Sequence, residues 1–237
     1  MEFHVYENAQ KACEAAAILI AAQITSKSDC ILGLATGSTP IPVYEKLVEW
    51  YKNGVLDFSD VRSFNLDEYI GIDHKNPLSY HAFMQENLFD HVNIVPENTH
   101  VPDGDMTGEE YDASIRAAGG IDIQLLGIGK NGHIGFNEPA DAFTYGTHVT
   151  DLTQSTIDAN SRFFESIDDV PRQAISMGIG SIMEARRVIL VATGKDKAEA
   201  VYKMMKEPVT PHVPASVLQL HPDCIILVDE AAASLMK

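Results

Sequence analysis

The chain has 237 residues, 45% of them hydrophobic and 22% charged, an ordinary composition for one or two globular domains. Its formal net charge of -17 disfavours nucleic acids and anionic membrane surfaces as partners, because both attract basic faces. The sequence has no apolar run as long as a membrane span and begins without a signal peptide, so we expect a cytoplasmic protein. Its three cysteines, an odd number, favour reduced thiols over disulfides or a metal site.

Helical and extended segments alternate along the chain. The expected helices lie at residues 8–26, 40–53, 78–90, 107–117, 155–166, 174–184, from 198 to about 206, 215–219 and from 229 onward. The expected strands, short and almost entirely apolar, lie at 30–35, 61–66, 121–126, 187–192 and 224–228. Asn8 is a suitable N-cap for the first helix, and Thr107 with Glu110 forms a capping-box sequence.

This pattern predicts an α/β fold with a mostly parallel sheet and helices on both faces, since apolar strands that alternate with helices need cover on two sides. Residues 142–153 are less regular and are expected to form a strand or an extended lid. Because no linker-like segment interrupts the chain, we expect one domain over residues 1–237.

Polar loops follow four of the predicted strands. Loops that follow parallel strands emerge at the same edge of a sheet, so side chains far apart in sequence can meet there. The first loop, Thr36–Pro40, leads from a strand into a helix and has the glycine and hydroxyl residues that suit a phosphate site. It is not a P-loop, because it lacks the Gly-Lys-Ser/Thr sequence. A tight turn that caps the helix is the alternative interpretation.

Two adjacent acids, Asp67 and Glu68, follow the strand at 61–66. Adjacent acids usually mark a solvated turn. At the mouth of a sheet, however, a carboxylate could take a proton from carbon.

The longest polar loop, Gly127–Pro139, contains a G-x-G-x-x-G sequence directly after a strand. A dinucleotide site requires the third glycine to open a helix, and Gly135 and Pro139 argue against a helix here. We therefore do not expect a nicotinamide cofactor. The acid about twenty residues further on, Asp151, lies in a polar run rather than at the end of an apolar strand.

The same loop carries three groups that can handle protons: Asn131, His133 and Glu138. Glu138 could orient His133, as a base and its orienting partner require. A structural histidine is the alternative. Arg162 and Lys197 are basic candidates for a phosphate site in this acidic chain, and no metal-binding spacing occurs.

Five segments together resemble the glucosamine-6-phosphate deaminase family, over nearly the whole chain. They are residues 34–40 (LATGSTP), 64–69 (FNLDEY), 126–139 (LGIGKNGHIGFNEP), 160–164 (NSRFF) and 218–221 (LQLH). The resemblance implies a Rossmann-like fold with a lid at about 140–177. It also implies a cofactor-free and metal-free reaction in which glucosamine 6-phosphate and water give fructose 6-phosphate and ammonia.

The resemblance also implies roles for individual residues. His133 would open the sugar ring as acid and base, with Glu138 and Asn131 setting its protonation and orientation. Asp67 would take the proton from C2 and return it at C1, with Glu68 as a neighbour. Another set would hold the phosphate: Gly37, Ser38, Thr39, Arg162 and Lys197.

The chain departs from the family at two places. Many members have aspartate where this chain has Asn131, and asparagine cannot stabilise an imidazolium by charge. Longer, hexameric members carry basic residues of an allosteric site where this chain has His148 and Thr150, and they extend beyond Lys237. We therefore expect weak or absent activation by N-acetylglucosamine 6-phosphate.

Two other functions stay open at this point. One is a hydrolase resembling 6-phosphogluconolactonase, which has a related fold. The other is a sugar-phosphate sensor without turnover, which would not need a base such as Asp67. The sequence does not separate a monomer from a homo-oligomer.

Overall fold

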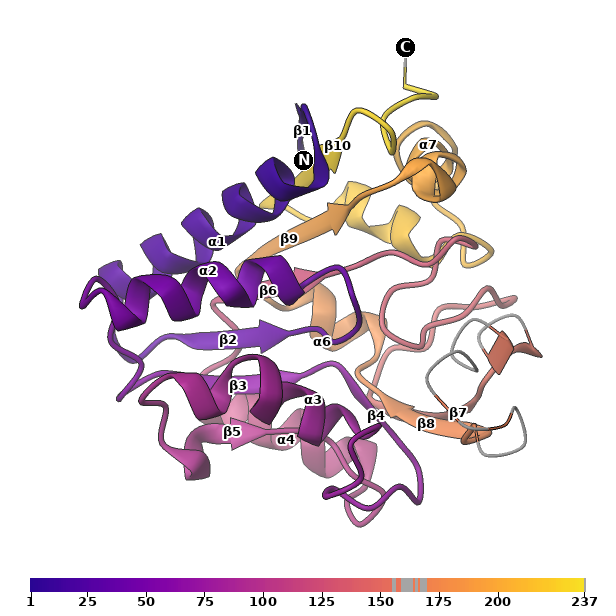
Figure 1. Ribbon diagram of the computed structural model, residues 1–237. Coiled ribbons are helices and arrows are strands. Elements are labelled where there is room, and N and C mark those ends of the chain that lie inside the picture. The colour runs from indigo at the N-terminus through magenta and orange to yellow at the C-terminus, as the bar shows by residue number, and fades with distance from the viewer. Residues whose placement is uncertain (155–156, 159–163, 165, 167–169, 237) are drawn as a thin grey trace.

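The computed structural model describes residues 1–154, 157–158, 164, 166 and 170–236. Its main element is a seven-stranded sheet whose neighbouring strands are parallel. In order across the sheet, the strands are β1 (Glu2–Tyr6), β10 (Cys224–Asp229), β9 (Arg187–Ala192), β6 (Ile123–Leu126), β2 (Ile31–Leu34), β3 (Arg62–Asn65) and β5 (Thr99–His100). Figure 1 shows both chain ends on the side of β1 and β10.

Helices cover both faces of this sheet (Figure 1). One apolar cluster joins the strands to α1 (Ala9–Ser26), α2 (Ile41–Lys52) and α3 (Tyr80–Asn87). A second cluster, on the opposite face, includes α4 (Gly108–Ala118), α6 (Ile179–Met183), α7 (Ala198–Lys206) and the 3-10 helix η6 (Pro214–Leu220). This arrangement confirms the predicted α/β class with a parallel sheet between two helical layers.

A second, smaller sheet lies beside the first one. It consists of three antiparallel strands in the order β4 (Asp67–Tyr69), β8 (Gln173–Ser176) and β7 (His148–Asp151). Two predictions are wrong here. The acidic segment after β3 forms a strand instead of a loop, and the predicted helix at 174–184 begins as β8 and becomes helical only at Ile179. Ala174, Ile175 and Ser176 are buried between two partner strands, and Gly178 separates them from the helix.

Edge strands and chain ends account for most other differences. The strands β1 and β5 were not predicted, because both lie at sheet edges and lack a continuous buried apolar run. The segment after Asp229 forms turns rather than a helix. Shorter 3-10 helices occur at Phe89–His91, Pro96–Asn98 and Lys195–Lys197. Most of the predicted helix at 155–166 lies outside the described residues.

Both predicted helix caps are confirmed. The Asn8 side chain accepts a hydrogen bond from the Lys11 N–H, 3.0 Å away. Thr107 and Glu110 form the reciprocal capping box at the start of α4. Local side-chain chemistry therefore fixes where these helices begin.

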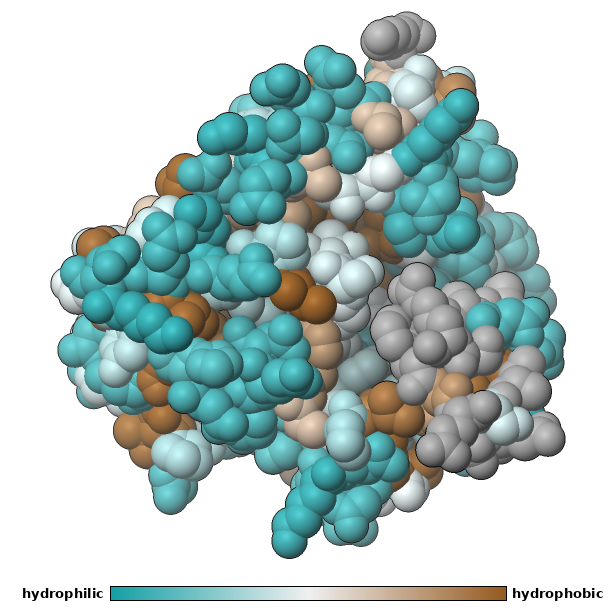
Figure 2. Space-filling view, viewed as in Figure 1, coloured by the Kyte–Doolittle hydropathy of each residue, from teal (hydrophilic) through white to brown (hydrophobic). Residues whose placement is uncertain are grey.

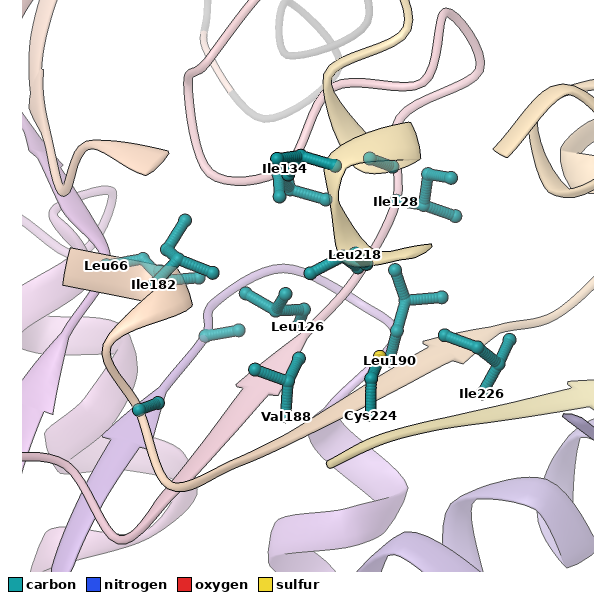
Figure 3. Close-up of a cluster of buried hydrophobic side chains, with 14 of the residues drawn as sticks. Leu66, Leu126, Ile128, Ile134, Ile182, Val188, Leu190, Leu218, Cys224 and Ile226 are labelled. Atoms are coloured by element: carbon teal, nitrogen blue, oxygen red, sulfur yellow. The ribbon is translucent and has the colours of Figure 1, made fainter. Parts of the chain in front are cut away.

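The apolar core extends beyond the strands into the loop that follows β6. Figure 3 shows Ile128 and Ile134 of this loop in the same cluster as Leu126, Leu190 and Leu218. Ile128 is 6% exposed and Ile134 is fully buried. Because these side chains pack into the core, the polar residues between them are held on a fixed support.

The outer surface over α1 and α2 is largely hydrophilic, and the same face is hollowed at its middle, near the end of β2 (Figure 2). Within the described residues, none of the helices combines the length and apolarity needed to cross a bilayer.

Candidate active site

Four neighbouring strands, β9, β6, β2 and β3, end next to the polar segments singled out in the sequence. The loop Thr36–Pro40 follows β2, the loop Gly127–Pro139 follows β6, and the turn with Lys197 follows β9. Asp67 comes two residues after the end of β3. Parallel strands bring these segments to one sheet edge, as expected.

The loop Gly127–Pro139 contains turns and no helix, as Gly135 and Pro139 predicted. The Gly129 N–H donates to the His133 carbonyl at 2.9 Å, which closes the loop on itself. The Gly132 carbonyl accepts from the Ala215 N–H at 2.9 Å, which ties the loop to η6. The loop is therefore anchored by backbone bonds as well as by its buried isoleucines.

Asn131, His133 and Glu138 form a connected group, as predicted. One carboxylate oxygen of Glu138, Oε2, accepts from Asn131 Nδ2 at 2.6 Å. The other, Oε1, lies 3.2 Å from His133 Nδ1, close enough for a charge contact but not aligned for a hydrogen bond. The His133 N–H also donates to Asn131 Oδ1 at 3.2 Å. The His133 side chain is 24% exposed and that of Glu138 is 8% exposed, so the imidazole faces the more open side.

The His133 ring packs directly on the backbone of Gly129. A Cβ atom at position 129 would collide with the imidazole ring. Any side chain there would displace the ring, so this glycine is required by the site itself.

Asp67 is buried and only 6% exposed. Burial, with a smaller contribution from the neighbouring Glu68 charge, raises the pKa of Asp67 from 3.8 to about 8. A Cβ built on Gly135 would lie 3.6 Å from Asp67 Oδ2, so the loop of His133 passes directly over this carboxyl. The two halves of the site, distant in sequence, thus meet in space. A carboxyl that titrates this far above its usual range, at a sheet edge, is a candidate proton acceptor.

Glu68 has a structural arrangement of contacts. Its carboxylate accepts backbone hydrogen bonds from Tyr69, Tyr80 and His81 at 2.8–2.9 Å. These bonds fasten the first turn of α3 to β4. Glu68 therefore supports the strand of Asp67.

The predicted phosphate residues lie in two separate turns. Gly37, Ser38 and Thr39 connect β2 to α2, and Cys13 Sγ contacts the Thr39 carbonyl from α1 at 3.6 Å. Lys197 ends the 3-10 turn Lys195–Lys197 after β9. Arg162 lies outside the described residues.

Two groups of supporting residues are absent from the predicted set of site residues, although the turn that contains Met177 was expected near the site. Ser176 pairs with Asp67 of β4 and Met177 bonds Leu66 just before it, and both residues also contact the loop of His133. Reading 173–176 as a strand would have indicated them. Asp229, at the end of β10, accepts from the Gly194 N–H at 3.0 and 3.1 Å and so holds the turn of Lys197. An acid that directly follows an apolar strand was the signal for this residue.

A cavity of about 280 Å³ adjoins the site and is lined in part by Glu138. His148, Thr150 and Asp151 of β7 line it, together with Asn137. Within the described residues, no cluster of three or more histidine, cysteine or acidic side chains is suited to hold a metal ion.

Comparison with known proteins gives consistent matches over the whole chain. The family model for glucosamine-6-phosphate isomerases/6-phosphogluconolactonase matches residues 5–226. The chain is 58% identical to a glucosamine-6-phosphate deaminase from Clostridioides difficile over 224 residues, which cover 92% of this chain and 90% of that protein. It is 52% identical to one from Halothermothrix orenii over 242 aligned residues, which cover 100% of both chains.

Comparison with solved structures agrees with these sequence matches. The structure of a monomeric glucosamine-6-phosphate deaminase matches with a TM-score of 0.96 and 40% identity, covering 99% of this chain and 100% of that one. A 6-phosphogluconolactonase from Leishmania guyanensis matches with a TM-score of 0.76 and 20% identity, covering 98% and 97%. The second likeness concerns the fold alone.

Proposed function

The chain belongs to the glucosamine-6-phosphate isomerase/6-phosphogluconolactonase family, and from its contacts we propose how its residues divide the reaction. Its activity is that of a glucosamine-6-phosphate deaminase, in amino-sugar metabolism. The observation that carries the proposed mechanism is the meeting of the buried Asp67 with the loop of His133 and Glu138.

Ring opening requires one proton to leave the hydroxyl at C1 and another to reach the ring oxygen. His133 is proposed to move these protons, because an imidazole can donate and accept them near neutral pH. Glu138 faces Nδ1 of the ring, so the other nitrogen, Nε2, is the one proposed to face the sugar. Asn131 holds the second oxygen of Glu138 and keeps this carboxylate in place.

Isomerisation then moves a proton between neighbouring carbons. Asp67 is proposed to take the proton from C2 of the open-chain sugar, which gives an enolamine, and to return it at C1. The resulting imine at C2 adds water and releases ammonia, leaving the ketone of fructose 6-phosphate. The raised pKa of Asp67, about 8, makes it a stronger base than an exposed aspartate once it is ionised. A substrate ammonium group at C2 would favour that ionised form.

The phosphate is proposed to bind between the two turns at the sheet edge. Backbone N–H groups of Gly37, Ser38 and Thr39 precede helix α2, whose dipole favours an anion. Lys197 and Arg162 would supply positive charge in a chain with twice as many acidic as basic residues, 34 against 17.

One assay tests the activity against its alternatives. Incubation with glucosamine 6-phosphate should yield ammonia and fructose 6-phosphate in equal amounts. Hydrolysis of 6-phosphogluconolactone in place of both products would favour a lactonase-like enzyme. Substrate binding without turnover would favour a sensor.

A second experiment tests the role of Asp67. Asp67→Asn keeps the size of the side chain but removes the base, so exchange of the C2 hydrogen with solvent deuterium should fall at least ~100-fold. Substrate binding should be nearly unchanged. Exchange at the wild-type rate would exclude Asp67 as the base.

We also propose that the protein is a monomer, because a solved deaminase described as monomeric matches nearly its entire length. Light scattering in solution tests this directly. A cytoplasmic location is proposed as well, since Cys13, Cys30 and Cys224 are buried free thiols, which suit a reducing compartment.

A further inference from the structure

Two adjacent residues, Ser176 and Met177, join the strand of Asp67 to the loop of His133. On the strand side, Ser176 lies directly opposite Asp67 in the antiparallel β4–β8 pair, and the Met177 N–H donates to the Leu66 carbonyl at 2.7 Å. On the loop side, the Phe136 N–H donates to Ser176 Oγ at 2.9 Å. The Met177 carbonyl accepts from Asn137 Nδ2, also at 2.9 Å.

The Ser176 hydroxyl is the side-chain part of this junction and is fully buried. Its oxygen would lie 3.0 Å from a Cβ built on Gly135, and Asp67 Oδ2 would lie 3.6 Å from the same point. Gly135 has a φ of +58°, so the chain turns sharply there. The loop therefore passes close to the serine hydroxyl and to the carboxyl of Asp67 at a single position.

We propose that Ser176 is a positioning residue of the deaminase reaction, whose hydroxyl holds the loop of His133 at a fixed distance from Asp67. This inference rests on the roles proposed for Asp67 and His133. The two residues act in turn on C1, C2 and the ring oxygen of one bound sugar, which are neighbouring atoms. A shift of about 1 Å between the two groups can cost about 100-fold in rate. A buried hydrogen bond to the loop backbone is a direct means of preventing that shift.

The main test compares three variants. Ser176→Ala removes the acceptor of the Phe136 N–H, so we expect kcat to fall about 10- to 100-fold while KM changes less than about threefold. Ser176→Thr keeps a hydroxyl and suits a strand, so it should recover most of the lost kcat. Ser181→Ala is the matched control. Ser181 is also a buried, hydrogen-bonded serine, which donates to Asp112 Oδ1 at 2.6 Å, but it lies in α6 and has no hydrogen bond to the loop of His133. This control should lower the melting temperature and keep kcat.

The result that overturns the proposal is a folded Ser176→Ala protein with wild-type kcat, or an equal loss of kcat in Ser181→Ala. Failure of Ser176→Thr to recover activity, with its fold intact, also counts against it. If Ser176→Ala does not fold, Ser176→Cys replaces it, because cysteine has the same number of side-chain heavy atoms as serine but is a weak acceptor. Asp67→Asn is measured in parallel. Retained C2 exchange in Asp67→Asn would refute the assignment of Asp67 as the base. If Asp67→Asn is inactive while Ser176→Ala keeps the wild-type kcat, only the positioning role of Ser176 is refuted.

Discussion

The role proposed for Asp67 as a base opposes stability at a single residue. The Asp67 carboxyl is buried. Burial and the negative charge of Glu68 raise its pKa, and no cation is among the causes of the shift. A base needs a raised pKa to take a proton from carbon, and burial supplies it. The same burial penalises the ionised form in the folded state.

This penalty predicts a pH-dependent gain of stability in Asp67→Asn. The folded pKa, about 8, lies above the unfolded value near 3.9, so the folded state binds more protons between these values. The wild-type free energy of unfolding should therefore fall as pH rises from about 4 to about 8, and asparagine removes that loss. We expect the variant to exceed the wild type by a few kcal/mol at pH 8 to 9 and by much less near pH 5. Urea denaturation at several pH values measures the difference, and a difference independent of pH would contradict burial of the charged carboxylate as its cause.

Asn131 predicts a second residue-scale effect, on the pH dependence of the rate. Its amide donates to Glu138 at 2.6 Å, and an aspartate in its place would bring two carboxylates together. Two facing carboxylates hold a proton among them to higher pH. We expect the plot of kcat against pH to change in Asn131→Asp. The limb that reports protonation of the His133–Glu138 group should move upward by about one pH unit. The control is Asn93→Asp, on the surface turn with Asp57, which should leave the profile unchanged.

At the scale of single elements, a strand or turn was predictable where local signals were strong. The buried apolar strands β9 and β10, the Asn8 cap and the Thr107 capping box follow from local sequence. The β8 strand does not, because Ala174 and Ile175 suit a helix as well as a strand, and only pairing with β4 and β7 decides between them. The same ambiguity concealed Ser176. The acidic pair after β3 was read as a loop for a related reason, since its partner strand comes more than a hundred residues later.

The turn that carries Lys197 gives an element-scale prediction. The buried carboxylate of Asp229 holds this turn through the Gly194 N–H and also accepts from the Ala232 N–H at 2.7 Å. Asp229→Asn weakens these charge-assisted bonds, each typically about 1.5–3 kcal/mol. We expect KM for glucosamine 6-phosphate to rise about tenfold, with kcat kept, and inorganic phosphate to inhibit more weakly.

The control for this prediction lies at the opposite end of the same strand. Asp223 precedes β10 and pairs with Arg187 at 2.8 Å, away from the turn of Lys197. Asp223→Asn should leave KM unchanged. An equal rise in both variants would mean that Asp229 acts through general stability alone.

At the scale of the whole molecule, the fold and the set of site residues were predictable to different degrees. Alternating helices and apolar strands predicted the parallel sheet, and strand order then brings the Thr36, Asp67, His133 and Lys197 segments together without further assumption. What the sequence could not supply was the three-stranded second sheet, which depends on pairing between distant segments. That sheet is also what positions Asp67 under the loop of His133.

The cavity beside Glu138 gives a prediction about regulation of the whole enzyme. It is lined by His148 and Thr150, which the family resemblance aligns with basic residues of an allosteric site in longer members, and also by Asp151. A phosphate would meet the Asp151 carboxylate there, with no lysine or arginine among the described lining residues to offset the repulsion. N-acetylglucosamine 6-phosphate should therefore leave the substrate saturation curve hyperbolic and unmoved, and calorimetry should detect no second binding site. A clear shift of the saturation curve to lower substrate concentration on adding this sugar phosphate would contradict the prediction. It would show that the cavity, or another surface, binds the sugar phosphate despite the Asp151 carboxylate.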